Sequence, residues 1–421
     1  MFINNQTPKG TKDYSTEILK QHKAIEEKLV GFFELWGYKE IKTPIIEFGS
    51  IFSQNLGNEL AKKMFKFQDF DGEILTLRPE MTIPIVRNII TKATKREQPC
   101  RISYFAYVFR YNQSYLERAR EFWQAGIELI DFPTIERDGE ILALLASSVK
   151  EIGIKDFQID INYLSIFQEL FANIFLSEEE KHLLKNKIII RDKGYLEVYL
   201  KEKGLSLEEI RVILDLIDYQ PISSVCRKID TNQLNYLSFK SYLLKLNQIL
   251  DDYDLQDIVY FDITLTKEID YYTGLIFEVS IPNMGIIIGS GGRYDTLLEN
   301  FGRNDLGGIG FALEIDRCIQ ALTIARSNFT LKNRASVLIL TSNRKMGIKL
   351  SKIMRSLTFI TTLEVVTDLS FIDTFEGSEY FDYVIFYDGT SVNEVKVLEV
   401  NTKSFDRVTF EALEKISGDS N

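Results

Sequence analysis

The sequence predicts an α+β fold in which helices flank an antiparallel sheet, with a helical insertion and a small C-terminal α/β domain. Segments 102–111 and 121–130 alternate apolar and polar residues with a period of two, as two paired strands do. Segment 165–251 is instead rich in Leu, Lys and Glu, and strand-like and helix-like segments alternate toward the C-terminus. We therefore expect a main domain over 1–330, containing this helical insertion, and a second domain over 331–421.

Length and composition exclude several classes of protein. The 421 residues, 45% of them hydrophobic, suffice for a sizeable core and exceed one typical domain. The net charge of -11 argues against a protein that coats nucleic acid by bulk charge. The N-terminus lacks an apolar signal core and no run of about 18 apolar residues occurs, so we expect a cytoplasmic protein that contacts no membrane.

Cysteine and histidine are too sparse to suggest a metal centre. The three cysteines lie far apart and form no Cys-x-x-Cys pair. His22 and His182 each lie in a stretch rich in Lys and Glu, so we interpret both as solvated residues on helix faces. We expect no metal, no cofactor and no catalysis by a histidine general base.

The N-terminal part of the chain predicts a helix, a strand and a hairpin, in that order. Segment 17–36 has the apolar spacing of an amphipathic helix, which Gly37 ends. Segment 38–48 is strand-like, and Pro44 confines it to a sheet edge or an interface. Contact with a second subunit is one use for such an edge. An Asp-Gly turn at 71–72 then indicates a hairpin.

Glu80 and Thr82 follow Pro79, which excludes a helix directly before it. They therefore lie on the loop or the first turn of a helix predicted over 83–91. Residues of these types in this position commonly cap a helix N-terminus, and taken alone the stretch favours that interpretation over a ligand site.

The hairpin over 101–131 carries the most chemistry in the chain. Arg110 lies on one side of its first strand, and Gln124, Gly126 and Glu128 share one side of its second. If the hairpin brings them together, a cation, an amide and a carboxylate surround a glycine that leaves room for a ligand. Such a patch suits a small zwitterion. The alternative is the wet face of a half-exposed sheet.

Downstream of this hairpin, a helix over 137–152 and a strand over 157–161 precede the insertion. Within the insertion, Ser206 and Glu209 form a capping-box pattern. The acidic residues at 251–254 are interpreted as a solvated turn, because no strand precedes them as a metal or pyrophosphate loop requires. Strands return over 259–264, 274–281 and 285–288.

Residues 289–295 read Gly-Ser-Gly-Gly-Arg-Tyr-Asp, and glycines at this density let the backbone approach another group closely. One interpretation is a phosphate cradle, and the other is close packing of a strand on a helix. Neither a Walker loop nor a dinucleotide-binding motif matches this stretch.

From residue 306 a Gly-rich strand leads into a helix that carries Arg317. The C-terminal domain then alternates strands and helices, which marks a small α/β domain. Its predicted elements are strands at 337–341, 363–367, 383–387 and 394–400, and helices at 346–357 and after 367.

Taken in order, several of these segments resemble the class II aminoacyl-tRNA synthetases, and among them the histidyl-tRNA synthetase branch. The matching stretches are PKGTKDY, the helix and Pro44 strand (motif 1), LRPEMT, FR followed by REFWQAGIE (motif 2), EIDYYTG, GSGGRYD and GIGFALEIDR (motif 3). The resemblance implies a class II synthetase-like sheet of six or more strands and a dimer formed through motif 1. It also implies that the C-terminal domain is similar to an anticodon-binding domain.

The resemblance further implies a histidine-binding site. In the synthetases the amino acid is held by residues that here correspond to Glu80, Thr82, Arg110, Gln124, Glu128 and Tyr272. The glycines of GSGGRYD, Gly291 and Gly292 among them, line that pocket. Carboxylates suit an ammonium and an imidazole N–H, whereas an arginine and an amide suit a carboxylate. This set agrees with the patch expected from strand periodicity.

The ATP-binding half of the synthetase pattern is degenerate. Asn112 and Gln113 replace the Glu and Arg of motif 2, and Lys267 and Glu268 replace an Arg-Gly pair. A lysine offers a point charge in place of a planar bidentate fork, and Glu268 adds negative charge beside the phosphates. Of the phosphate-binding set only Arg317 remains.

A synthetase-like pocket of this kind resembles the regulatory subunits of ATP phosphoribosyltransferase, with Met81 and Trp123 where the synthetases have Gly and His. The resemblance implies a subunit without catalytic residues that binds free histidine and assembles with a short catalytic subunit. It would then mediate feedback on the first step of histidine biosynthesis, with tRNA not expected as a partner. The alternative is a divergent histidyl-tRNA synthetase, which the retained C-terminal domain favours.

Overall fold

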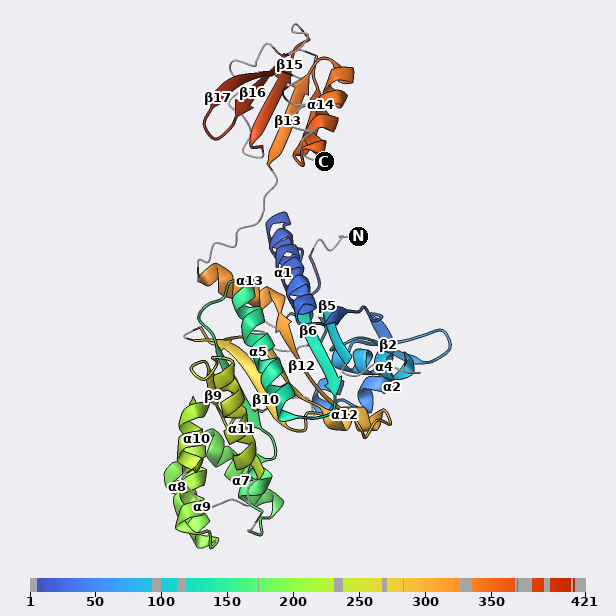
Figure 1. The fold of residues 1–421 in the computed structure, drawn as a ribbon. Helices are drawn as coiled ribbons and strands as arrows, with labels where there is room; N and C mark the ends of the chain where they lie inside the picture. The colour runs from blue at the N-terminus through green and yellow to red at the C-terminus, as the bar shows by residue number, and fades with distance from the viewer. Residues whose placement is uncertain are drawn as a thin grey trace. The chain divides into compact units, whose positions relative to one another are not determined.

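The chain divides into two compact units, Met1–Phe329 and Thr330–Asn421 (Figure 1). The structure is a computed structural model. It describes residues 6–92, 100–111, 119–172, 174–230, 238–266, 271–282, 284–325, 335–367, 369, 381–389, 394–409 and 412.

Unit 1 is built on a nine-stranded sheet with the order β1-β5-β6-β12-β11-β10-β7-β9-β8. Neighbouring strands are antiparallel except for β1 with β5 and β7 with β9, which are parallel. The predicted α+β class is confirmed, although the two parallel pairings were not expected. The strands are β1 (Lys39–Glu40), β5 (Cys100–Phe109), β6 (Glu121–Asp131), β7 (Gln158–Tyr163), β8 (Gln220–Pro221), β9 (Val259–Phe261), β10 (Leu275–Ile281), β11 (Ile286–Arg293) and β12 (Gly307–Glu314).

Each face of this sheet packs in its own apolar core. On one face, α1 (Thr16–Leu35), α5 (Ile135–Glu151) and α13 (Ile315–Ile324) cover the central strands (Figure 1). The other core includes residues of α4 (Thr82–Lys92), α2 (Gly49–Ser53) and α12 (Asp295–Asn300). The period-two pattern of β5 accounts for this division, because Phe105 belongs to the first core whereas Tyr104 and Ala106 belong to the second.

The predicted strand over 38–48 is broken around Pro44. Its first part, β1, pairs with β5 at the edge of the large sheet, and its second part, β2 (Ile46–Phe48), joins a separate small sheet. That sheet has the order β2-β4-β3, with β3 (Lys66–Gln68) and β4 (Ile74–Leu77) forming the predicted hairpin. The hairpin turn needs a glycine, since Gly72 has a φ of +88°.

The insertion is helical, as predicted, and is tied to the large sheet. Its helices are α6 (Ile166–Leu170), α7 (Glu178–Ile189), α8 (Lys193–Glu202), α9 (Leu207–Leu216), α10 (Ile222–Asp230) and α11 (Ser238–Asp252). The predicted capping box of Ser206 and Glu209 is confirmed, and Ser177 and Glu180 form a second one. Two contacts connect the insertion to the rest of unit 1: β8 pairs with β9 of the large sheet, and α11 packs on α5.

Unit 2 contains a five-stranded sheet with the order β14-β13-β15-β16-β17. The first three strands are parallel and the last two antiparallel, and β17 was not predicted. The helix expected after residue 367 lies outside the described residues. The elements are β13 (Ser336–Thr341), α14 (Arg344–Ser356), β14 (Ile360–Val365), β15 (Tyr383–Tyr387), β16 (Glu394–Glu399) and β17 (Ser404–Thr409).

The expectation that His22 is solvated is wrong. Its side chain is 2% exposed, its ring lies edge-on to Tyr14 at 4.9 Å, and its Nε2 is 3.3 Å from the Asp316 carboxylate. His22 shares the buried face of α1 with Ile25 and Leu29, so helical spacing explains the burial. His182 is exposed, as predicted.

Neither a membrane span nor a metal cluster is found in the part of the chain that the structure describes. No helix there is long and apolar enough to cross a bilayer. No group of His, Cys, Asp and Glu side chains there could hold a metal ion.

Candidate functional site

The predicted polar patch lies in a small cavity between the large sheet and the start of α4. The cavity has a volume of about 50 Å³, which is room for a few water molecules. Its wall contains six of the side chains expected to hold histidine and further tyrosines. The lining residues are Glu80, Met81, Thr82, Tyr104, Arg110, Gln124, Glu128, Tyr271, Tyr272, Ser290, Tyr294, Gly310, Phe311 and Ala312.

The register of the central hairpin places Gln124 opposite Ala106 and Glu128 opposite Ile102. Arg110 therefore does not lie beside these residues on the sheet. It follows the end of β5, where its backbone N–H donates to the Arg120 carbonyl at 3.0 Å. From there the Arg110 side chain reaches the cavity, and its Nε donates to the Pro79 carbonyl at 2.8 Å.

Glu80 both caps α4 and lines the cavity. Its carboxylate accepts hydrogen bonds from the backbone N–H groups of Thr82 at 2.8 Å and Ile83 at 3.0 Å. The Tyr271 hydroxyl donates to it at 3.1 Å. The side chain is buried, and this burial raises the pKa of Glu80. The capping interpretation of Glu80 is therefore confirmed, and its position in the cavity wall is compatible with a ligand site.

Glu128 is the second buried carboxyl group of the cavity and is 2% exposed. The Thr82 hydroxyl donates to its Oε1 at 2.7 Å, and the Tyr294 hydroxyl donates to its Oε2. Burial raises the pKa of Glu128 to about 8 despite these donors, and the charge of Glu80 acts in the same direction. The carboxyl group is therefore largely protonated at neutral pH and ready to ionise beside a cation.

Two glycines make the space that these side chains occupy. A Cβ at Gly310 would lie 2.1 Å from Glu128 Oε2, and one at Gly126 would lie 2.4 Å from the Tyr104 hydroxyl oxygen. Both distances are shorter than real contacts, so a larger residue at either position would displace a cavity side chain. Gly126 was expected to leave room for a ligand, but the Tyr104 side chain fills the space beside it.

Tyrosines form much of the remaining wall. The ring of Tyr271 lies edge-on to Tyr272 at 5.1 Å and to Tyr294 at 5.9 Å. Burial raises the pKa of all three and of Tyr104, so these phenols stay neutral, and Tyr271 and Tyr294 donate hydrogen bonds to the two carboxyl groups. With two carboxyl groups and one arginine in the wall, the cavity suits a ligand that carries both a cation and an anion.

Gln124 is buried and lines the cavity, and its amide has no hydrogen-bond partner among the described residues. The amide can donate and accept hydrogen bonds, which suits the polar groups of a ligand. Of the other predicted residues, Gly292 does not line the cavity itself but lies beneath Tyr272, with its added Cβ 2.8 Å from that ring. Gly291 faces the opposite side of β11, toward Phe277, and does not line the cavity.

The glycine-rich stretch is a strand and not a phosphate-binding loop. Residues 289–293 belong to β11, in which residues 289–292 pair with β10 and residues 289–293 pair with β12. Arg293 at its end is buried and bonded to Asp138, which joins the strand to α5. The phosphate-cradle interpretation is therefore wrong, and close packing explains the glycines, chiefly strand against strand.

Of the degenerate ATP site, Asn112, Gln113, Lys267 and Glu268 lie outside the described residues. Arg317 is described and already engaged. Its Nε pairs with Glu314 at 2.6 Å, and its Nη1 donates to the Ile287 carbonyl at 2.8 Å. One third of the side chain is exposed.

The expected site residues did not include three tyrosines of the wall, Tyr104, Tyr271 and Tyr294. For Tyr104 a signal was present, because the period of two places it on the same side of the predicted first strand as Arg110. The contact of Tyr294 with Glu128 joins residues 166 positions apart, and no local pattern indicates it.

Comparisons with known proteins agree with this architecture. The family model described as histidyl-tRNA synthetase matches residues 10–318. The ATP phosphoribosyltransferase regulatory subunit of Clostridium novyi is 30% identical over 413 residues, covering 95% of each chain. The histidine–tRNA ligase of Methanocaldococcus jannaschii is 32% identical over 317 residues, covering 75% of this chain and 76% of that protein.

A solved structure from Bacillus halodurans is described as an ATP phosphoribosyltransferase regulatory subunit/histidyl-tRNA synthetase. It is 27% identical, has a TM-score of 0.78, and the match covers 93% of this chain and 100% of that one. The fold is therefore that of the histidyl-tRNA synthetases of class II. The chain belongs to the histidyl-tRNA synthetase family, in which its relatives include ATP phosphoribosyltransferase regulatory subunits as well as histidine–tRNA ligases.

Proposed function

We propose that this chain is a non-catalytic regulatory subunit of ATP phosphoribosyltransferase that binds free histidine in the cavity beside Glu128. The observation that supports the proposal most is the convergence of buried Glu80, Gln124 and Glu128 with Thr82 and Arg110 in one cavity. Relatives named as regulatory subunits support the same function. The partner would be a short catalytic subunit, and the chain would pair with a second copy through its motif 1 region.

The cavity offers a complement to each polar group of histidine. Two carboxyl groups suit the ammonium and an imidazole N–H, and Arg110 and Gln124 suit the carboxylate. Because the cavity holds only a few waters as it stands, histidine needs the wall to open. Arg110 and Tyr272 have the largest side chains among the half-buried members of the wall, and we expect these two to move.

The proposal that the chain does not activate histidine rests on the residues that correspond to the ATP site of the synthetases. Lys267 lacks the bidentate fork that clamps a phosphate in the transition state. Glu268 places a like charge near phosphates, and such a pair at 4 Å repels by about 1 kcal/mol in water and by more when buried. Arg317 is left, and Glu314 already neutralises it.

A divergent histidyl-tRNA synthetase is the second candidate. The retained α/β unit, which resembles an anticodon-binding domain, favours it, and so does the relative named as a ligase. The regulatory candidate is compatible with this unit, because the Clostridium novyi regulatory subunit matches 95% of the chain. The unit therefore does not decide between them.

Reconstitution with a short catalytic subunit tests the proposal. We expect a stable hetero-oligomer on a sizing column, with raised phosphoribosyltransferase activity that histidine inhibits. The sensitivity to histidine should be lost in Glu128→Ala and kept in Glu299→Gln, which removes an exposed carboxylate of α12 outside the cavity. Two proteins that migrate separately, with the catalytic subunit equally active and equally inhibited alone, would contradict the proposal.

A further inference from the structure

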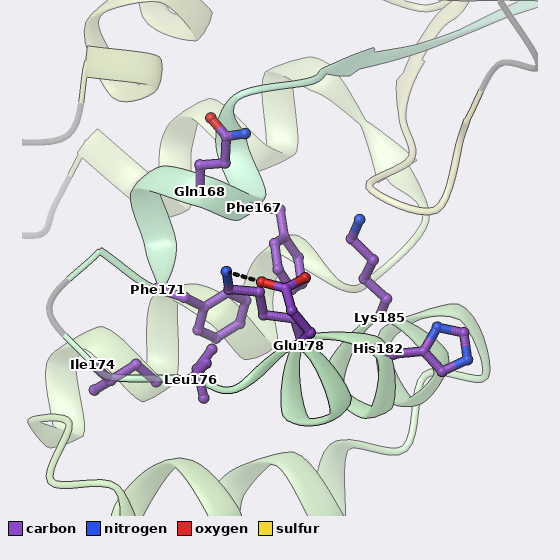
Figure 2. A pocket seen from close by; sticks show the side chains of 9 residues that line it. Phe167, Gln168, Phe171, Ile174, Leu176, Glu178, His182 and Lys185 are labelled. Carbon is purple, nitrogen blue, oxygen red and sulfur yellow. Dashed lines mark hydrogen bonds and ion pairs between the residues drawn. The ribbon is translucent and has the colours of Figure 1, made fainter. Parts of the chain in front are cut away.

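A second and larger cavity lies in the helical insertion, between α6 and α7 (Figure 2). Its volume of about 570 Å³ falls within the range of small-molecule sites. It shares no residue with the cavity around Glu128. Its lining residues are Phe167, Gln168, Phe171, Ile174, Leu176, Glu178, Lys181, His182 and Lys185.

One side of this insertion cavity is apolar and aromatic. The rings of Phe167 and Phe171 contact each other with centroids 4.7 Å apart and planes tilted by 58°. Ile174 and Leu176 continue the apolar surface, as Figure 2 shows. A pair of tilted rings beside aliphatic side chains provides area for stacking and burial of an apolar or aromatic body.

The other side carries the charges of α7. Glu178, Lys181, His182 and Lys185 follow the i, i+3, i+4, i+7 spacing of one helix face. Lys181 is paired with Glu178 at 2.7 Å, so these two charges cancel locally. Lys185 forms no ion pair among the described residues, although its charge acts on Glu178, and its ammonium lies 5.4 Å from the centroid of Phe167. The insertion cavity therefore presents one unpaired cation directly beside an aromatic ring.

A third cavity of about 180 Å³ extends the insertion cavity toward the large sheet. The two share Phe167, Gln168 and Lys185, and the smaller one is lined further by Ile188 and Ile263. Phe167 and Lys185 thus line both cavities. A ligand with two rings can place one ring in each cavity while its charged group stays next to Lys185.

We propose that the insertion cavity is a second ligand site, which takes an organic anion with an aromatic or apolar body. The body would pack on Phe167 and Phe171, and a carboxylate, sulfonate or phosphate group would pair with Lys185. Apolar burial supplies most of the affinity, and the single cation selects anions over neutral ligands of the same shape.

Fluorescence titration of the full chain with 1-anilinonaphthalene-8-sulfonate tests this site, because that probe is a two-ring aromatic anion. N-phenyl-1-naphthylamine is nearly the same molecule without the sulfonate and serves as the neutral probe. Lys185→Gln should weaken binding of the anionic probe roughly fivefold and leave the neutral probe unchanged. Phe171→Ala should weaken both. Lys201→Gln removes an exposed charge elsewhere in the insertion and should change neither.

The charge variants keep the test decisive even if Phe171→Ala does not fold, since Lys185 and Lys201 are both exposed. Thermal melts should show the two lysine variants to be as stable as the parent protein. The proposal is overturned if Lys185→Gln leaves the anionic probe unaffected or weakens both probes equally. It is also overturned if Lys201→Gln has the same effect as Lys185→Gln.

Discussion

The hydroxyl of Thr82 donates a hydrogen bond to Glu128 Oε1 at 2.7 Å, joining the first turn of α4 to β6 across 46 residues of sequence. The bond connects the two parts of the proposed histidine site, because Glu80 binds the backbone of Thr82 and Tyr294 binds the other oxygen of Glu128. The cavity is therefore one hydrogen-bonded unit in which a change at either carboxyl group affects the other.

Replacing Thr82 by alanine should destabilise the protein. The change removes a donor from a buried carboxyl group, which costs about 1–3 kcal/mol. Thr91→Ala is the matched control, because the exposed Thr91 hydroxyl bonds to a carbonyl on the same helix, that of Arg87, and to no other group among the described residues. Its free energy of unfolding should change by less than about 0.5 kcal/mol. Urea unfolding measures both, and equal losses would show that the bond to Glu128 contributes nothing.

The stability of the ligand-free protein should fall as the pH rises toward 8. The pKa of Glu128 is about 8 in the folded protein and 4.5 ordinarily, so between these values the folded state holds a proton that the unfolded chain has released. The contribution of this group is complete below about pH 4.5 and is lost as the pH rises through the folded pKa.

Comparison with Glu128→Gln isolates this effect from other titrating groups. The variant has no proton to lose at that position, so its melting temperature should gain on that of the parent between pH 5 and pH 8.5. Melting curves at four or five pH values are sufficient. A difference that stays constant with pH would mean that Glu128 is already ionised in the folded state.

Histidine binding should release a proton from Glu128 at pH 7, if the proposed site is correct. A cation placed beside the carboxyl group favours its ionised form and lowers its pKa. Affinity should therefore rise between pH 6.5 and pH 8, and the heat of binding should depend on the ionisation enthalpy of the buffer.

Calorimetry in phosphate and in Tris measures this proton release directly. Glu128→Ala should lose about 2–5 kcal/mol of binding free energy, because a buried charged partner is removed. Glu299→Gln should bind as the parent does. Binding without any buffer dependence, or with full affinity in Glu128→Ala, would place histidine elsewhere.

Local patterns predicted the elements of this site well, because the period of a strand or helix is a local property. The period-two pattern correctly grouped Gln124 with Glu128 on one side of the second strand. The same reasoning could have found His22 as a buried residue, since it precedes Ile25 and Leu29 at helical spacing. Its neighbouring lysines and glutamates obscured that signal.

Features of the site that depend on pairing between distant segments could not be predicted from the sequence. The position of Arg110 follows from the register of β5 with β6, which the loop between them does not reveal. The glycines at 289–292 have little intrinsic strand preference, and pairing with β10 and β12 overrides it. The insertion cavity arises from the way α6 meets α7, and its residues carry no motif.

The last prediction concerns the reaction that the chain should not perform. Adenylate formation needs groups that clamp the α-phosphate and read adenine, and these act on the transition state. In this sequence those groups are replaced by Lys267, Glu268, Asn112 and Gln113. The remaining Arg317 is already bound to Glu314 and to the Ile287 carbonyl. We therefore expect no histidine-dependent exchange of pyrophosphate into ATP by the purified protein, under conditions in which an intact histidyl-tRNA synthetase is active.

Binding of histidine without exchange would separate the regulatory function from the synthetase function, because the amino-acid half of the site would then work without the ATP half. Robust exchange by this chain alone would establish the divergent synthetase instead.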